Sequence, residues 1–169
     1  MDNRIKRTVF LAVSVALAMI LSFVESLVPP LSTVPGVKIG LSNIVTVFLL
    51  YRLGWREAGI VSIVRVLLSA LLFGSAVSLF YSVMGALLSF FVMVFSKRLL
   101  PFSEIGVSVL GGVFHNAGQI IAAIILMENT AIAYYMVPLV ISGTLAGIAV
   151  GVLGGIVTRR IKLKGKKGL

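Results

Sequence analysis

Six long apolar stretches fill almost the whole of this 169-residue chain. They cover residues 8–28, 38–53, 55–73, 76–95, 104–127 and 132–158. A helix needs about 20 apolar residues to cross the hydrocarbon core of a bilayer, and all stretches but the second are of about this length. Backbone polar groups inside lipid must be satisfied within the protein. The sequence therefore predicts an all-α, polytopic membrane protein, with six transmembrane helices forming one bundle and one domain over residues 1–169.

The composition favours the same class of protein. Hydrophobic residues make up 59% of the chain and charged residues 12%, with a mean hydropathy of +1.15. A soluble domain carries about 25% charged residues. Despite the formal net charge of +10, a soluble DNA-binding protein or receptor is excluded, and no nucleic-acid partner is expected. The basic N-terminus leads into the first apolar stretch without a small-residue cleavage site, so we expect that span to be retained.

The basic residues predict the orientation of the bundle. Of the 15 Lys and Arg, 13 lie before the first stretch, on either side of the corner between the second and third, after the fourth, or after the sixth. If the helices alternate in direction, all of these positions fall on one side of the bilayer. The positive-inside rule then places both termini in the cytoplasm. We interpret the basic tail, residues 159–169, as a topology signal, although an anionic-lipid patch is an alternative.

Polar side chains from five stretches reach a similar depth in the predicted bundle. At 1.5 Å per residue, Arg65 lies roughly 15 Å and His115 roughly 16 Å from the cytoplasmic boundary. Such side chains are costly in lipid and are rarely kept without a role. We therefore predict a substrate-binding cavity that is open to the outside and closed toward the cytoplasm. Its candidate residues are Glu25, Lys38, Asn43, Arg65, Tyr81, His115, Asn116 and Gln119.

The charges in this set predict the kind of ligand. Lys38, Arg65 and a protonated His115 outnumber the single carboxylate of Glu25, so an anionic molecule is favoured. Arg65 would be the partner of a carboxylate or phosphate, since a guanidinium binds either with two parallel hydrogen bonds. Two structural alternatives remain open. Arg65 could pair with Glu25, and His115 could form a hydrogen bond with Asn43.

The sequence lacks the residues that several kinds of chemistry require. There is no cysteine and one histidine, so no metal site is expected. The P-loop pattern is absent, and Asp2 is the only aspartate, so neither ATP hydrolysis nor magnesium–diphosphate chemistry is predicted. No serine has the context of a nucleophile. We interpret the chain as a binder or carrier that is not itself an enzyme and needs no cofactor.

Small residues at four-residue spacing mark two candidate docking faces. Gly143, Gly147 and Gly151 follow this spacing in the sixth stretch, and Ala12 and Ala16 in the first. Small side chains let helices approach closely in lipid. These faces could dock another membrane protein, or they could pack within the bundle.

Four segments carry a resemblance to a known family. They are PGVKIGLSN at residues 35–43, LGWREA at 53–58, RVLL at 65–68 and GVFHNAGQ at 112–119. Over about residues 8–158 the chain resembles the Gx transporter family, also labelled heptaprenyl diphosphate synthase component I. This family is similar to the substrate-binding S components of energy-coupling factor (ECF) vitamin transporters.

The resemblance implies a multi-pass protein of the prokaryotic cell membrane that captures a vitamin-like or isoprenoid-related molecule. It also implies a transmembrane T component and two cytoplasmic ATPase subunits as partners, which drive uptake by toppling the S component. Ala12 and Ala16 match the small residues that contact the T component, and the segment from Pro29 to Gly36 would cover the pocket. Two alternatives remain: an accessory membrane subunit of a prenyl diphosphate synthase, and a proton-coupled carrier with His115 as its titrating group.

Overall fold

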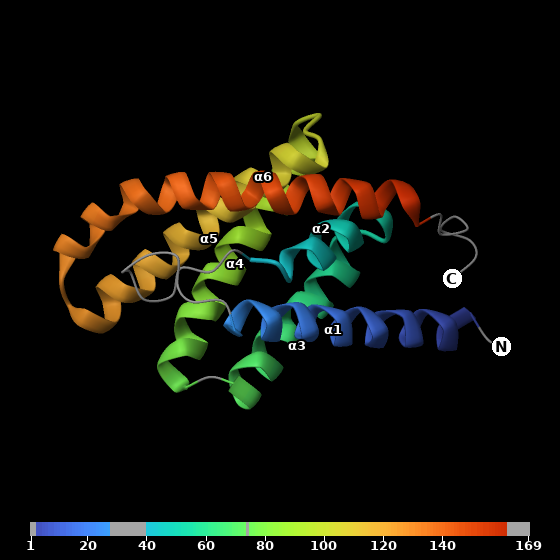
Figure 1. The fold of residues 1–169 in the computed structure, drawn as a ribbon, viewed down its shortest axis with the longest axis horizontal. Helices are drawn as coiled ribbons and strands as arrows, with labels where there is room; N and C mark the ends of the chain where they lie inside the picture. The colour runs from blue at the N-terminus through green and yellow to red at the C-terminus, as the bar shows by residue number, and fades with distance from the viewer. Residues whose placement is uncertain (1–2, 28–39, 74, 162–169) are drawn as a thin grey trace.

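The fold is all-helical over the residues that the structure, a computed structural model, describes: 3–27, 40–73 and 75–161. Figure 1 shows the helices crossing one another at varied angles in a single bundle. In these ranges the elements are α1 (Asn3–Leu27), α2 (Asn43–Arg52), α3 (Trp55–Phe73), α4 (Ala76–Leu99), α5 (Glu104–Met127), the short 3₁₀ helix η1 (Thr130–Tyr135) and α6 (Met136–Arg160). The predicted all-α class is confirmed for this part of the chain.

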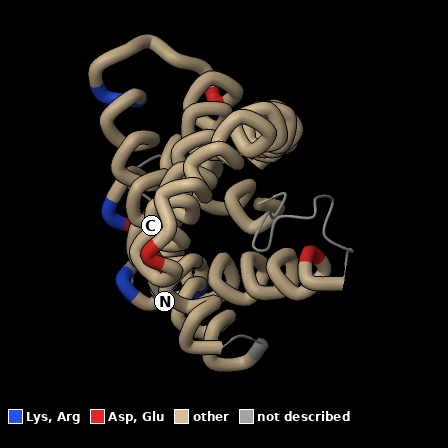
Figure 2. Tube along the Cα trace, turned by 90° about the vertical axis from the view of Figure 1, so that its left-hand side faces the viewer, with Lys and Arg blue, Asp and Glu red and all other residues tan. Residues whose placement is uncertain are grey.

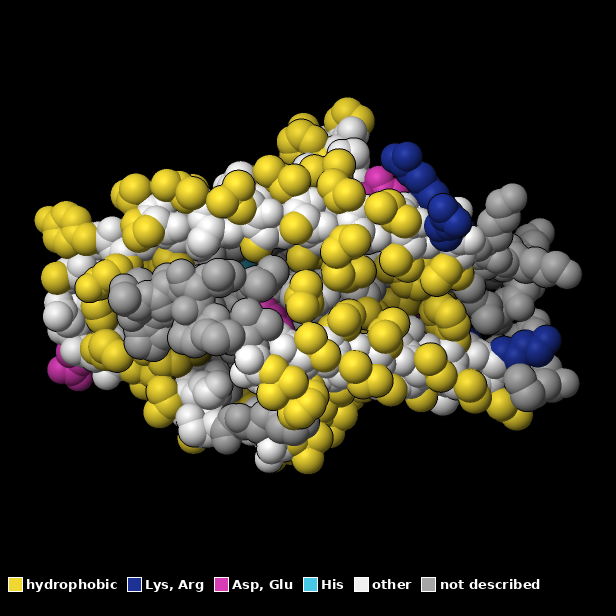
Figure 3. Space-filling view, viewed as in Figure 1, with side chains coloured by type: hydrophobic (Ala, Val, Ile, Leu, Met, Phe, Trp, Pro, Cys, Tyr) yellow, Lys and Arg dark blue, Asp and Glu magenta, His cyan; other side chains and the backbone are white. Residues whose placement is uncertain are grey.

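Within the described residues, four stretches of helix are long and apolar enough to cross a membrane: Arg4–Leu27, Ala76–Leu99, Glu104–Met127 and the continuous Thr130–Arg160. Hydrophobic side chains cover most of the face seen in Figure 3, and Lys and Arg lie toward its right-hand end. The predicted membrane character is therefore confirmed. The other two helices differ, because α2 has 10 residues and α3 carries Arg56, Glu57 and Arg65 within its 19.

Helix α2 is shorter than the predicted span of residues 38–53. It begins at Asn43, after a turn in which Gly40 adopts the left-handed backbone conformation with a φ of 78°. Glycine adopts this conformation without a steric penalty, so the chain changes direction here before the helix starts. Six consecutive residues of α2, from Val45 to Leu50, are buried. A helix that is apolar all round belongs in the centre of a bundle, and α2 contacts α1, α3, α5 and α6.

Glycines bring α5 and α6 into backbone contact. A Cβ atom added to Gly147 would lie 2.5 Å from the Cα of Val109, and one added to Gly151 would lie 2.6 Å from the Cα of Ile105. Gly143 faces the backbone of Gly112 in the same way. Since α5 covers this face, the partner-docking role predicted for Gly143, Gly147 and Gly151 is corrected to packing within the bundle.

The basic residues gather where α1 begins and α6 ends. We call this the basic end; its described members are Arg4, Lys6, Arg7, Arg52, Arg56, Lys97, Arg98, Arg159 and Arg160. Figure 2 shows several of these positions along one edge of the trace. Side chains there join separate helices: Arg7 forms an ion pair with Glu57, and Lys97 donates a hydrogen bond to the carbonyl of Leu50.

The glycine contact generates a stability prediction. Gly147→Ala should lower the stability of the bundle by about 1–3 kcal/mol, because the new methyl group meets backbone that cannot move aside. The measurement is the thermal unfolding midpoint of the purified protein in detergent. Gly155→Ala is the matched control, since its Cβ would have only the Cβ of Glu104 nearby, at 3.9 Å. Equal midpoints for the two variants would contradict the packing described here.

Candidate functional site

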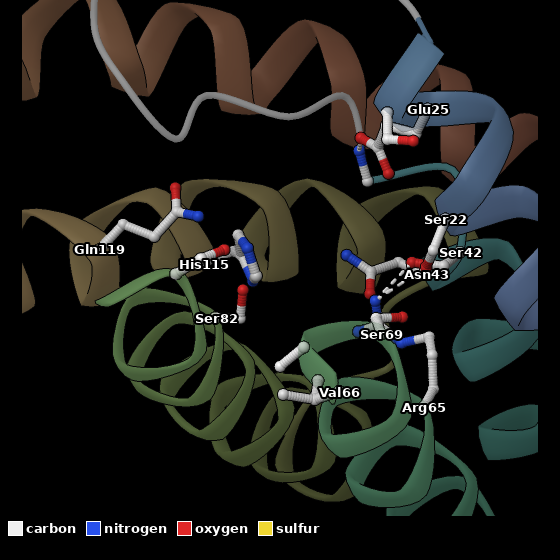
Figure 4. A pocket seen from close by; sticks show the side chains of 14 residues that line it. Ser22, Glu25, Ser42, Asn43, Arg65, Val66, Ser69, Ser82, His115 and Gln119 are labelled. Atoms are coloured by element: carbon white, nitrogen blue, oxygen red, sulfur yellow. Dashed lines mark hydrogen bonds between the residues drawn. The ribbon is translucent and has the colours of Figure 1, made fainter. Parts of the chain in front are cut away.

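A polar pocket of about 80 Å³ lies among α1, the start of α2, α3, α4 and α5. It occupies the half of the bundle away from the basic end, and Figure 4 shows it from close by. Its lining residues are Ser22, Glu25, Ser26, Gly40, Ser42, Asn43, Arg65, Val66, Ser69, Ala70, Ser78, Ser82, His115 and Gln119. Five residues of the predicted set are thus brought together: Glu25, Asn43, Arg65, His115 and Gln119.

Arg65 reaches the pocket from α3, and serines hold its guanidinium group. One terminal nitrogen donates a hydrogen bond of 2.7 Å to the Oγ atom of Ser42 and a longer one of 3.5 Å to that of Ser22. Among the described residues, no carboxylate lies within ion-pair distance of Arg65. The alternative in which Arg65 forms an ion pair with Glu25 is therefore not the arrangement in this structure. The hydrogen bonds of Arg65 to described residues thus go to neutral hydroxyl oxygens, while Glu25 acts on its charge through space without forming an ion pair.

Glu25 fixes the turn that precedes α2. Its carboxylate accepts a hydrogen bond from the backbone N–H of Gly40, so the end of α1 is tied to the start of α2. The next two residues, Leu41 and Ser42, form the turn, and α2 then runs from Asn43 toward the basic end. The N-terminal end of a helix carries a partial positive charge. This end of α2 faces the pocket next to Arg65, as Figure 4 shows.

The opposite wall comes from α4 and α5, which meet closely at glycines. A Cβ atom on Gly118 would lie 2.6 Å from the carbonyl oxygen of Met84, and one on Gly85 would lie 3.0 Å from the Cε1 atom of His115. This close approach sets His115 and Gln119, one turn apart on α5, beside the pocket. In Figure 4 the side chains of His115 and Ser82 point toward one another.

Two predicted site residues lie away from the pocket, and a third is outside the described residues. Asn116 is buried and turned toward α6, where its amide nitrogen donates hydrogen bonds to the carbonyl of Leu139 at 2.8 Å and to Ser142 Oγ at 3.4 Å. Tyr81 does not line the pocket, because Ser78 and Ser82 occupy the face of α4 that does. Lys38 lies outside the described residues, as does the predicted lid from Pro29 to Gly36.

The serines of the lining were largely missed by the sequence prediction. Ser22 and Ser26 flank Glu25 on α1, and Ser78 and Ser82 follow each other by one turn on α4. Residues three or four apart share a face of a helix. This spacing was therefore a usable signal. Serine is common in packed membrane helices, however, so the spacing alone does not separate a pocket from a helix contact.

A family model described as heptaprenyl diphosphate synthase component I matches residues 14–157. The chain belongs to this family. The matched range includes all six α-helices in whole or part and every residue of the pocket. The family resemblance predicted from the sequence is thus confirmed. The chain matches no curated protein and no solved structure.

The donor set of this family member favours recognition of anionic groups. A guanidinium, two amides, an imidazole and several hydroxyl groups surround the pocket, together with one carboxylate. A guanidinium and hydroxyl groups can all donate hydrogen bonds to a carboxylate or phosphate. Among the described residues, no group of three or more His, Asp or Glu side chains is placed to hold a metal ion.

The two amides of α5 should differ in their effect on stability. Asn116→Ala should cost about 1 kcal/mol, because it removes a buried interhelical hydrogen bond to the carbonyl of Leu139, which then keeps only the Ser142 hydroxyl as a side-chain donor. Gln119→Ala should cost less, because the Gln119 amide has no hydrogen bond to a described residue and faces the pocket. Chemical unfolding in mixed micelles measures both. A larger loss for Gln119→Ala would reverse the assignment.

Proposed function

We propose that the chain is the substrate-binding S component of an ECF-type importer, and that it captures a small anionic organic molecule in the polar pocket. The observation that carries this proposal is Arg65, a largely enclosed guanidinium held by serines at a pocket shared by five helices. A charge at such a position is costly in a membrane protein, and it is commonly retained for binding or transport. The protein would bind its substrate without altering it chemically.

Two features of the pocket favour an anion. Among the described residues, the hydrogen-bond partners of Arg65 are hydroxyl groups and no carboxylate is in ion-pair contact with it, which favours binding of a ligand anion. The N-terminal end of α2 adds a partial positive charge on the same side of the pocket. Glu25 is engaged with the Gly40 backbone at the rim of this region. A carboxylate or phosphate would therefore bind near Arg65 and Ser42, and the polar remainder of a ligand near His115 and Gln119.

The size of the pocket requires a change on binding. Sites for drug-sized or vitamin-sized molecules generally have volumes of about 300–1,000 Å³, several times the 80 Å³ found here. The described pocket accommodates a few water molecules or one functional group of a ligand. Capture of a whole molecule would need the surrounding helices to separate. Return of the helices to the closed arrangement would leave too little room for the substrate and would release it.

The remaining elements of the proposal concern topology and partners. We propose that the chain crosses the bilayer six times with the basic end in the cytoplasm, following the positive-inside rule, and that the short helix α2 supplies only the inner part of the second crossing. The small side chains of Ala12 and Ala16 are exposed on α1 and leave a shallow face. We propose that a transmembrane T component docks on this face, with two ATPase subunits supplying energy. Copurification of the three partners with the full chain would support this assembly.

Binding should depend on the charge of Arg65. Arg65→Gln should weaken ligand binding about tenfold to a hundredfold, because a hydrogen bond to a charged group contributes about 1.5–3 kcal/mol. The ligand is first identified by mass spectrometry of small molecules that copurify with the chain. Its dissociation constant is then measured for each variant. Ser42→Ala should have a smaller effect, since it removes a partner of Arg65 and keeps the charge.

Arg160→Gln is the matched control for this experiment, because it removes the same charge from an exposed position outside the pocket. Both variants must retain the unfolding midpoint of the parent protein for the comparison to hold. If Arg65→Gln binds the copurified molecule as tightly as Arg160→Gln does, the pocket assignment is wrong. If uptake in cells is unchanged after deletion of the ATPase subunits, the ECF mechanism is wrong.

The family description favours a second candidate function, an accessory membrane subunit of a prenyl diphosphate synthase. In that role the chain would recruit a soluble synthase to the membrane or accept its product. A pull-down of the synthase, with product yield that depends on this chain, would favour the second function. Synthase activity that is the same with and without the chain would exclude it.

A further inference from the structure

A second and larger cavity runs along the outer surface of the bundle. It has a volume of about 650 Å³ and follows one face of α4 from Met84 to Arg98, with Trp55 at one end and α5 at the other. Its lining residues are Trp55, Met84, Leu87, Leu88, Phe90, Phe91, Val94, Arg98, Gly118 and Ile121. The distance along α4 is roughly 21 Å, longer than the roughly 15 Å of hydrocarbon in one leaflet. We call this cavity the α4 groove.

The α4 groove is apolar except at the basic end. Phe91 and Leu87 are 68% and 54% exposed, which in a membrane protein places them against acyl chains. Any apolar face of a membrane protein meets lipid, so these residues alone indicate no particular occupant. The features at the Trp55 end distinguish this groove from an ordinary lipid-facing surface.

Two guanidinium groups share the indole ring of Trp55. The Cζ atom of Arg56 lies 5.4 Å from the ring centroid, and that of Arg98 lies 5.3 Å from it. The ring attracts each cation, and the two like charges are no more than about 10.7 Å apart, the sum of the two centroid distances. The carboxylate next in sequence, Glu57, is already paired with Arg7 of α1. Among the described residues, neither Arg56 nor Arg98 has a carboxylate partner, so the pair is set to receive an anion.

We propose that the α4 groove is a binding site for one anionic phospholipid from the leaflet at the basic end. The phosphate would lie between Arg56 and Arg98 at the edge of Trp55, and one acyl chain would lie along α4 toward Gly118. Tryptophan and arginine are both suited to the interface where a headgroup lies. Arg98 and Trp55 line the same groove as the apolar residues of α4. The ligand must therefore be anionic and must also carry a long hydrocarbon chain. This site is separate from the polar pocket and does not depend on its function.

Native mass spectrometry of the delipidated full chain tests this proposal. Dioleoyl phosphatidylglycerol and dioleoyl phosphatidylcholine have the same tails, so their difference in binding isolates the headgroup charge. Phosphatidylglycerol should bind more tightly. Arg98→Gln should weaken its binding about fivefold, since each basic residue near an anionic surface contributes about that factor. The double variant Arg56→Gln with Arg98→Gln should bind the two lipids equally.

Two further variants separate this site from a general charge effect. Arg159→Gln removes the same charge from the exposed end of α6 and should leave the preference for phosphatidylglycerol intact. Leu87→Trp fills the groove from an exposed position and should weaken phosphatidylglycerol binding although both arginines remain. Equal losses for Arg98→Gln and Arg159→Gln would overturn the proposal. Displacement of phosphatidylglycerol by farnesyl diphosphate at a concentration below that of the lipid would also overturn it. That result would assign the groove to a prenyl diphosphate instead.

Discussion

The structure depends on the burial of the middle of a helix that is too short to cross a bilayer by itself. Helix α2 has 10 residues, and its apolar side chains are enclosed by four other helices. Because it begins part-way through the bundle, its first turn and the Ser42 hydroxyl lie inside the protein rather than at its surface. Polar groups at that depth need partners. Glu25 and Arg65 supply some of them, and the polar pocket forms around this helix end.

Counting residues along each apolar stretch placed several polar residues in one layer, but it did not predict which way their side chains face. Glu25, Asn43, Arg65, His115 and Gln119 were expected in one layer and do line one pocket. Asn116 lies at the same depth as His115, but the next residue on a helix is turned by about 100° and faces α6 instead. The start of α2 at Asn43 rather than at residue 38 was also missed, because hydropathy does not reveal the left-handed turn at Gly40.

The spacing of small residues likewise did not predict which helix face is covered by a neighbour. The glycines of α6 and the alanines of α1 follow similar patterns, yet the first set is buried against α5 and the second is exposed. The difference lies in the neighbouring helix, since Gly112 of α5 offers its own backbone opposite Gly143. A pattern within one helix cannot show whether such a complement exists. The limits of α3 and α5, in contrast, agree with the predicted stretches, because charged and helix-breaking residues bound both.

The glycine contacts also make one wall of the polar pocket stiffer than the other. Where α4, α5 and α6 touch backbone to backbone, at Gly118 and Gly147, there are no flexible side chains between them that could rearrange. His115 and Gln119 are therefore carried on a fixed wall. Ser22, Glu25 and Arg65 stand on α1 and α3, which meet through side chains such as Ser69 and Met19. A molecule larger than the cavity would thus be admitted by displacement of the α1–α3 wall, the same wall that carries the guanidinium.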